Sequence, residues 1–194
     1  MQRTTKTKAK IRTAYIELLK SRGFEAMTVS AIVRAAGINR GTFYLHYVDK
    51  FDLQRRLLDD AIDDLTAIMR SGTPAAGVDD VEDIFSTESI AEALRYIKRD
   101  YAFFDAVSGS GSDMQLYDRF KDVLKRMLIL QAGRLGMPMR DHGGMPREYA
   151  LEILVSSVAS IIWLWIRHGC RESPEQICAI VERNKVTAPV DILK

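Results

Sequence analysis

The stretch of sequence that decides the fold is residues 28–50, Thr-Val-Ser-Ala-Ile-Val-Arg-Ala-Ala-Gly-Ile-Asn-Arg-Gly-Thr-Phe-Tyr-Leu-His-Tyr-Val-Asp-Lys. This stretch predicts two short helices joined by a tight turn. Thr28 and Asn39 are residue types that cap helix N-termini, because their side-chain oxygens accept hydrogen bonds from otherwise unpaired N–H groups. Gly37 stands where the chain must reverse, and glycine adopts the left-handed conformation of such a turn without a steric cost.

The second short helix, about residues 40–46, has one apolar residue that must point inward, Phe43. A helix this short does not persist alone in water, so neighbouring elements must hold it. Its remaining faces carry hydrogen-bonding and cationic groups: Arg40, Thr42, Tyr44 and His46. This arrangement is typical of a helix-turn-helix, whose second helix enters the major groove of DNA.

A long helix is expected on each side of this pair. The first runs from about Thr7 to Arg22 with apolar residues at helical spacing, and the next from about Asp49 to Arg70. Residues 1–10 are polar and basic, and the sequence leaves open whether they fray or lie along phosphates. The predicted core of the three-helix unit is Ile11, Tyr15, Leu18, Phe24, Val29, Ile32, Val33, Ile38 and Phe43.

The rest of the chain also has helical periodicity. Helices are expected at about Thr87–Val107, Asp113–Arg134 and Arg147–His168, with a last one opened by Ser173, Pro174 and a capping box to Gln176. Loops are expected at 71–81, 108–112 and 135–146, which are rich in Gly, Ser or Pro. The predicted fold is therefore all-α: a DNA-binding domain over residues 1–50, a connecting helix over 49–70, and a helical effector-binding and dimerisation domain over 71–194.

The charge is distributed unevenly along the chain. The whole protein has a net charge of +2, but residues 1–50 carry ten Lys or Arg against three Asp or Glu, and residues 51–194 carry eighteen against twenty-three. A basic end of this kind either meets a polyanion or is simply a solvated tail. The N-terminus has no apolar segment of the signal-peptide type. The longest apolar run, 153–166, is shorter than the roughly 20 residues that span a bilayer. We therefore expect a cytoplasmic protein without a membrane segment.

The residues of the central stretch now support a resemblance to a known family. Thr28-Val29, Ala35-Ala36-Gly37-Ile38, Gly41-Thr42-Phe43-Tyr44, Tyr47-Val48-Asp49-Lys50 and Leu53 resemble, without gaps, the DNA-binding domain of the TetR family of bacterial transcriptional regulators. The resemblance covers about residues 7–54. It implies that Thr28, Tyr44 and Lys50 contact DNA phosphates, and that Arg40, Thr42 and His46 contact bases or phosphates. Tyr47, Leu45 and Val48 depart mildly from the family pattern, and none of them disturbs the caps or the turn.

The C-terminal part, about residues 90–185, is more loosely similar to a TetR subgroup often found in Firmicutes. The similarity lies in a Tyr-Ile-Lys-Arg segment, a later Trp-containing helix and a Ser-Pro-Glu-Gln-Ile helix. The helix expected at 147–168 is apolar on nearly all sides in its second half, so it requires a partner helix, a ligand cavity, or both. Two adjoining helices of this kind pack against their two-fold copies, which predicts a homodimer through the two C-terminal helices.

The remaining candidate sites do not point to catalysis. His46, His142 and His168 lack metal-ligand spacing, Cys170 and Cys178 are expected to be ordinary thiols, and the Gly-x-Gly at 109–111 lacks the strand and the lysine of a phosphate loop. We expect no metal, no cofactor and no enzymatic activity. The acidic residues Asp59, Asp60, Asp63 and Asp64 are expected to form a solvated face.

These observations lead to one hypothesis and one alternative. The chain is expected to bind a palindromic double-stranded DNA operator as a homodimer, most simply as a repressor, and to be released by a small apolar or aromatic effector. The predicted effector pocket is lined by Tyr101, Phe104, Phe120, Met127 and Trp163. In the alternative, a protein partner docks on the C-terminal domain and replaces the small ligand.

Overall fold

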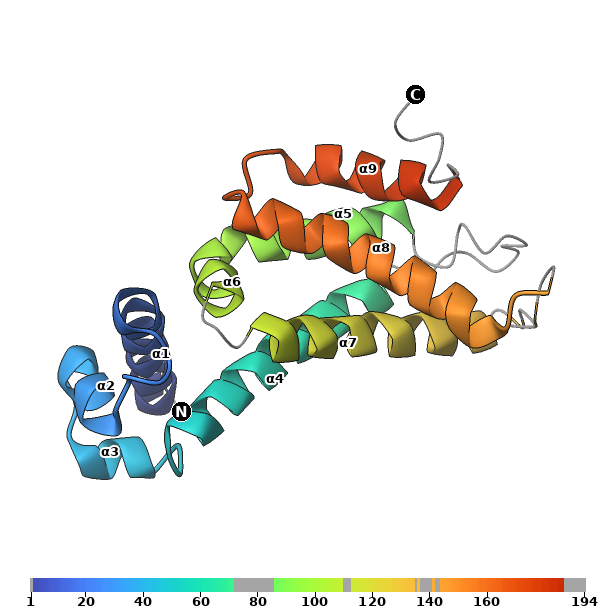
Figure 1. The fold of residues 1–194 in the computed structure, drawn as a ribbon. Helices are drawn as coiled ribbons and strands as arrows, with labels where there is room; N and C mark the ends of the chain where they lie inside the picture. Colours follow the sequence, from blue (N-terminus) through green and yellow to red (C-terminus); the bar gives the residue numbers. More distant parts are fainter. Residues whose placement is uncertain are drawn as a thin grey trace.

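The fold was analysed in a computed structural model, which describes residues 2–71, 86–109, 113–134, 136, 141 and 144–186. Within these ranges every regular element is a helix, as the sequence predicts (Figure 1). The helices are α1 (Gln2–Arg22), α2 (Val29–Ala36), α3 (Arg40–Tyr44), α4 (Lys50–Ser71), α5 (Thr87–Arg99), α6 (Tyr101–Ser108), α7 (Asp113–Arg134), α8 (Arg147–Arg167) and α9 (Pro174–Val186). Most of the three predicted loop segments lies outside the described residues.

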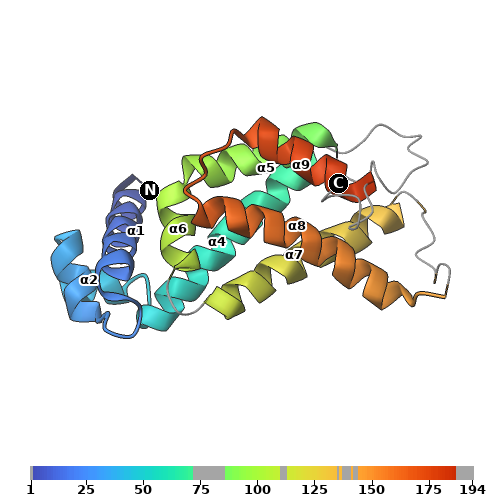
Figure 2. The same cartoon turned by 45° about the horizontal axis from the view of Figure 1, so that its top comes forward.

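Helices α1, α2 and α3 form a small unit at one end of the molecule, which we call the head (Figures 1 and 2). Its core is the one predicted from sequence: Ile11, Tyr15, Leu18, Phe24, Ile32, Val33 and Phe43 are buried, and Val29 and Ile38 pack against them. Three residues of α6 complete this core, namely Phe103, Ala106 and Val107. The head is therefore packed onto the rest of the molecule through α6 as well as through α4.

Helix α4 leads the chain away from the head. Two aspartates stabilise its start: Asp49, just before the helix, and Asp52 in its first turn. The Asp49 carboxylate accepts a hydrogen bond from the Asp52 N–H at 2.7 Å. The buried Asp52 carboxylate accepts a bond from the Val48 N–H at 3.1 Å and pairs with Arg55 and Arg56. The bond from Val48 and, to a smaller extent, the two arginines hold the pKa of Asp52 below its usual value, although burial opposes them.

This arrangement predicts a pH dependence of stability. Because the pKa of Asp52 is lower in the folded protein than in the unfolded chain, its carboxylate stabilises the fold above the unfolded value of about 3.9, and this contribution is lost as the pH falls further. The free energy of unfolding of the wild type should therefore fall more steeply between about pH 5 and pH 3 than that of Asp52→Asn. Urea unfolding measured across this range checks it, with the exposed Asp63→Asn as the control. Parallel curves for wild type and Asp52→Asn would contradict the assignment.

The segment expected to be one helix from Thr87 to Val107 is two helices, and this prediction was wrong. The chain bends at Asp100, where φ is −103° and ψ is 28°. The Asp100 N–H still donates to the Tyr96 carbonyl, while its own carbonyl accepts from Phe103 N–H at 3.0 Å, so one residue ends α5 and begins α6. The bend turns Phe103 toward the head, where it is buried, and leaves Phe104 only partly covered.

The first helix also differs from the prediction, because α1 begins at Gln2 and not near Thr7. The basic N-terminal segment is thus helical, and Lys6, Lys8 and Lys10 are exposed along it. The periodicity of apolar residues could not reveal these turns, since they bury no apolar stripe. The segment is therefore not frayed, and whether it lies along phosphates stays a prediction.

Helices α4, α5, α8 and α9 enclose the second core, on the side away from the head (Figure 2). The predicted capping box is confirmed: Ser173 N–H donates to Gln176 Oε1 at 2.7 Å, and Gln176 N–H donates to Ser173 Oγ at 3.2 Å. Cys170 and Cys178 lie in this core as free thiols, and burial raises the pKa of Cys170 to about 11. Both thiols therefore stay protonated at neutral pH, as expected of ordinary thiols.

Two ion pairs join α1 to the bend at Asp100 and to α6. The Arg12 guanidinium makes two hydrogen bonds to the Asp100 carboxylate and lies 4.6 Å from the centre of the Phe103 ring. Lys20 Nζ pairs with Asp105 at 2.6 Å. Both carboxylates stand on or next to α6, so α6 is fastened to the head by charge as well as by apolar packing.

Candidate nucleic-acid interface

The turn between α2 and α3 has the geometry that the sequence predicts. Thr28 Oγ1 accepts a hydrogen bond from the Ala31 N–H at 3.1 Å and caps α2. Gly37 adopts φ 63° and ψ 42°, and the following Ile38 N–H closes the turn on the Val33 carbonyl at 3.0 Å. Because a side chain at φ near +60° is strained, the glycine fixes the angle at which α3 leaves α2.

Helix α3 is held by its cap and by one buried ring. Asn39 Oδ1 accepts from the Thr42 N–H at 2.7 Å and from the Thr42 hydroxyl at 2.9 Å. Phe43 is fully buried and lies edge-on to Tyr44, with ring centres 5.6 Å apart. The cap and the buried ring supply the stability that five residues of helix cannot supply for themselves.

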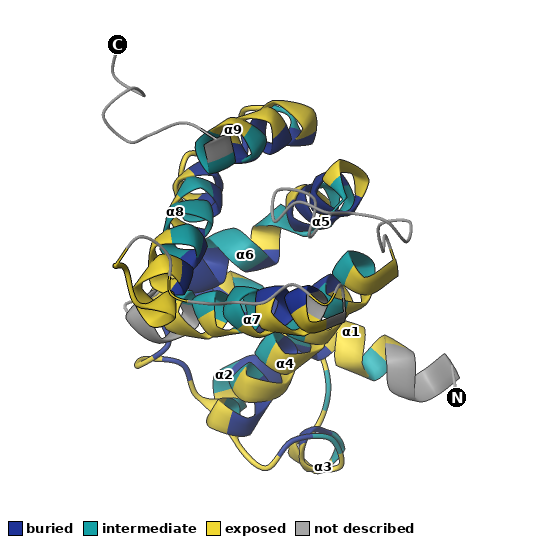
Figure 3. Ribbon diagram, turned by 90° about the vertical axis from the view of Figure 1, so that its right-hand side faces the viewer, coloured by how far each residue is buried: buried dark blue, intermediate teal, exposed yellow. Residues whose placement is uncertain are grey.

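The side chains opposite Phe43 form an open surface of hydrogen-bonding groups. Arg40 and Tyr44 are exposed, and the Arg40 guanidinium donates to the Tyr44 hydroxyl at 3.3 Å. Thr42 and His46 are half-buried, and Thr28 is exposed at the start of α2. Figure 3 shows α3 at an extremity of the molecule with no other helix over its outer side. The structure therefore brings the predicted DNA-binding residues of α3 to one accessible end.

Lys50 is placed differently from the other predicted contact residues. Its ammonium donates to the Phe24 carbonyl at 3.0 Å and to the Glu25 carbonyl at 3.1 Å, and it lies 4.7 Å from the centre of the Phe24 ring. Lys50 therefore ties the start of α4 to the connection between α1 and α2. An ammonium has three donors, so these two bonds are compatible with a phosphate contact.

Exposed apolar side chains lie beside this polar surface, and sequence reasoning did not select them. Leu45 is 82% exposed, Val48 72% and Phe51 59%, at the end of α3 and around the start of α4. The sequence singled out Leu45 and Val48 only as departures from a family pattern. Apolar side chains that face DNA contact thymine methyl groups and sugars, so all three are candidates for this surface.

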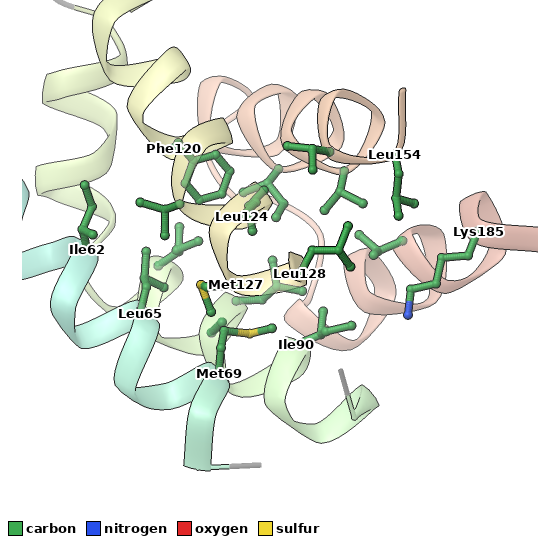
Figure 4. A pocket seen from close by; sticks show the side chains of 18 residues that line it. Ile62, Leu65, Met69, Ile90, Phe120, Leu124, Met127, Leu128, Leu154 and Lys185 are labelled. Atoms are coloured by element: carbon green, nitrogen blue, oxygen red, sulfur yellow. The ribbon is translucent and has the colours of Figure 1, made fainter. Parts of the chain in front are cut away.

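The second candidate site is an apolar cavity of about 310 Å³ inside the other half of the molecule (Figure 4). Its walls come from α4, α5, α7, α8 and α9, and they include Leu65, Ile90, Phe120, Met127 and Leu154. Among its described lining residues Lys185 is the only charged one. Figure 4 shows Lys185 at one side of the cavity and Ile62 with Phe120 toward the other. A cavity of this size and composition suits a small apolar ligand.

Comparison with known proteins finds a match for each of the two parts of the chain that contain these sites. The profile of "Bacterial regulatory proteins, tetR family" matches residues 11–57, and that of "Transcriptional regulator C-terminal region" matches residues 86–184. The second match alone covers more than half of the chain. The chain belongs to the TetR family. Proteins of this family are DNA-binding transcriptional regulators, the class of function that the sequence predicts.

A curated relative of this TetR-family regulator is the "Uncharacterized HTH-type transcriptional regulator YxbF" of Bacillus subtilis (strain 168). The two are 24% identical over 175 residues, which make up 87% of this chain but 42% of the relative. The chain thus spans about two fifths of the length of that relative.

Solved structures of other regulators share the fold. A TetR-family regulator from Syntrophomonas wolfei has a TM-score of 0.68 at 16% identity, covering 93% of each chain. NalD of Pseudomonas aeruginosa, a repressor of a multidrug efflux pump, has a TM-score of 0.66 at 19% identity over 93% of this chain and 95% of its own. The fatty acid degradation regulator FadR of Bacillus halodurans has a TM-score of 0.65 at 16% identity, covering 91% of this chain and 93% of its own.

The five side chains predicted to form the effector pocket of this TetR-family protein lie in three places. Phe120 and Met127 line the large cavity. Phe104 and Trp163, again with Phe120, line a smaller cavity of about 30 Å³ between α4, α5, α6, α7 and α8. Tyr101 lines neither cavity, and Lys20 Nζ lies 5.6 Å from the centre of its ring. The residues that sequence reasoning missed are aliphatic ones, such as Leu65, whose role as cavity wall or solid core is not distinguishable from periodicity.

Proposed function

We propose that this TetR-family regulator is a homodimeric, ligand-released repressor that binds a pseudo-palindromic DNA operator in the cytoplasm. The observation that carries the proposal is the combination of two sites in one chain. An open polar helix lies at one end, and an almost wholly apolar cavity of about 310 Å³ lies in the other half. A cavity buried between helices favours a small ligand over a docked protein as the regulator.

The dimer is supported by an apolar face on the two C-terminal helices. Tyr149, Ile153 and Leu164 of α8 and Ile180 of α9 are each between 47% and 61% exposed. On α8 these residues recur at helical spacing and form one stripe. Ser157 Oγ accepts a hydrogen bond from Asn184 Nδ2 at 2.9 Å and joins α8 to α9 beside the stripe. A two-fold copy of the same face would cover it.

Helix α8 also has the length and apolar composition of a membrane-crossing helix, and it is the one helix of this kind in the described part of the chain. It packs against α6, α7 and α9, and a third of its most apolar window is buried inside the protein. Leu151, Val155, Ala159, Ile162, Trp165 and Ile166 face these neighbours. We therefore assign α8 to the helical domain, with its remaining apolar face available for a second subunit.

The two kinds of DNA contact can be separated by substitution. Arg40→Ala should change the preferred operator sequence, because discrimination of about 1–3 kcal/mol comes from each good base contact. Lys50→Ala should weaken binding to all sequences alike and lower the slope of log affinity against log salt by about one, since it removes one phosphate contact. Titration of cognate and scrambled duplexes at several salt concentrations distinguishes them. If Arg40→Ala leaves the preference unchanged, α3 is not the reading helix.

The proposal as a whole is tested by selecting bound duplexes from a random DNA pool with the purified protein. We expect an enriched inverted repeat whose half-sites share one sequence, as a two-fold dimer requires. Addition of an apolar compound that raises the thermal stability of the protein should then release this operator. A pool that shows no enrichment, together with no affinity for duplex DNA in dilute buffer, would reject the proposal.

A further inference from the structure

The large cavity borders a second cavity on the side where Ile62 and Phe120 lie in Figure 4. Four of its lining residues, Ile62, Leu65, Ile97 and Phe120, also line the smaller cavity of about 30 Å³. The smaller cavity, which we call the satellite cavity, has Phe103, Phe104 and Val107 of α6 in its wall. The two cavities are therefore neighbours, separated only by side chains that they share.

The wall of the satellite cavity is also part of the core of the head. Phe103 and Val107 are buried against α1 and α4 in that core. The same helix α6 is tied to α1 by the pairs Arg12–Asp100 and Lys20–Asp105. A ligand that enlarges the satellite cavity on its α6 side therefore pushes on the helix that is fastened to the head.

The cavities set the size of the ligand. An apolar cavity of about 150 Å³ holds the six carbons of benzene. On this scale the large cavity of about 310 Å³ holds about twelve non-hydrogen atoms, and the satellite cavity of about 30 Å³ holds about one more. A shorter chain fits without moving the protein, while a longer one overpacks the satellite cavity and forces side chains and backbone to shift.

The charges set the polar end of the ligand. Lys185 is the charged group in the described lining, and its Nζ pairs with both carboxylate oxygens of Glu182 at 2.9 Å. An ammonium donates hydrogen bonds and accepts none, so Lys185 can bind a carboxylate or carbonyl oxygen of a ligand but offers nothing to a cation. The remaining described lining offers no carboxylate and a single aromatic ring, Phe120, so it lacks the groups that recognise a quaternary ammonium ion.

We propose that the effector is a single-chain apolar molecule with a carboxylate or carbonyl at one end, and that it acts only when its chain is long enough to reach the satellite cavity. This inference rests on the proposed function and adds to it the ligand class and a length threshold near twelve carbons. The acceptor end lies at Lys185. The tail passes Phe120 and meets α6, and the displaced α6 loosens the head. Shorter chains occupy the large cavity and leave operator binding intact.

The test is a series of n-alkyl carboxylates with eight to sixteen carbons, each used below its micelle concentration. Calorimetry measures binding and operator titration measures release. Affinity should rise about four-fold for each added methylene up to the threshold and less steeply beyond it, because overpacking opposes further binding. Release at saturation should be absent for eight and ten carbons and should exceed ten-fold for fourteen. Full release by saturating octanoate, or no binding of any chain by a protein that binds its operator, overturns the inference and leaves the proposed function standing.

A readout that needs no DNA separates the two proposals. Trp163 lines the satellite cavity, so its fluorescence should change with chains above the threshold and not with shorter ones. Trp163→Phe should abolish this change and reveal any background from Trp165. A fluorescence change that merely follows occupancy, whatever the chain length, overturns the inference even if the protein proves not to bind DNA.

Two substitutions in α6 should move the threshold in opposite directions. Phe104→Leu enlarges the satellite cavity and should let chains of thirteen to fifteen carbons bind without release. Val107→Ile fills it with one carbon and should lower the threshold by about one carbon. Thermal unfolding confirms that both variants fold. Alkyltrimethylammonium ions of equal length test the polar end, and we expect them to bind at least ten-fold more weakly than the carboxylates and their methyl esters. Equal binding of the cation, or an unmoved threshold in both variants, refutes the assignment.

Discussion

Replacing Leu164 with glutamate is expected to convert the dimer into monomers and to weaken operator binding by at least about 100-fold. Leu164 is 56% exposed and belongs, with Ile153, to the exposed apolar stripe of α8. In a two-fold interface the substitution occurs twice, so two carboxylates would be buried without partners, which is strongly unfavourable. A monomer also has half of the base and phosphate contacts and loses the fixed spacing of two heads.

Sedimentation measures the mass of the variant, and titration of the selected operator measures its affinity. Leu130→Glu is the matched control, because Leu130 is also a leucine, 65% exposed, on α7 and outside the stripe. It should remain dimeric and bind DNA as the wild type does. A dimeric Leu164→Glu, or a monomeric Leu130→Glu, would place the interface elsewhere.

Replacing Phe43 with alanine is expected to have the largest effect on stability, about 3–5 kcal/mol of unfolding free energy. Phe43 is fully buried beneath α3 and its ring centre lies 5.6 Å from that of Tyr47. Since small domains are stable by only about 5–15 kcal/mol, the head should be partly or wholly unfolded and DNA binding lost. The far cavity does not include Phe43, so a ligand of that cavity should still bind.

Chemical unfolding and calorimetric ligand binding check these two consequences separately. Leu45→Ala, two residues further on, provides the comparison, because an 82% exposed side chain contributes little to stability. Its unfolding free energy should stay within about 0.5 kcal/mol of the wild type. If Phe43→Ala were as stable as Leu45→Ala, the packing described for α3 would be wrong.

The head could be predicted from sequence because its determinants are local. The caps at Thr28 and Asn39 and the left-handed Gly37 each depend on residues within five positions of one another, as does the Ser173–Gln176 box that opens α9 outside the head. Such signals do not depend on what the rest of the chain does. The same is true of the stripe that buries Ile11 and Tyr15 in α1.

The bend at Asp100 and the walls of the cavity could not be predicted in this way. Apolar residues recur at helical spacing from Ile90 through Phe104, so the periodicity continues across a bend that only tertiary contacts with α1 reveal. Aromatic content likewise suggested Tyr101 and Trp163 as pocket residues, whereas aliphatic side chains make up most of the lining of the large cavity. Whether an apolar side chain faces a void or another side chain is a property of the assembled helices.

The bend at Asp100 also determines how motion can spread through this protein. Because the chain is already interrupted there, the eight residues of α6 can tilt as a stiff lever while the hydrogen bonds inside α5 stay intact. Switching between the two operator affinities would then require no melting and no refolding. It should leave the far-ultraviolet circular dichroism unchanged and proceed on the microsecond-to-millisecond scale of rigid-body motion, faster than local unfolding would allow.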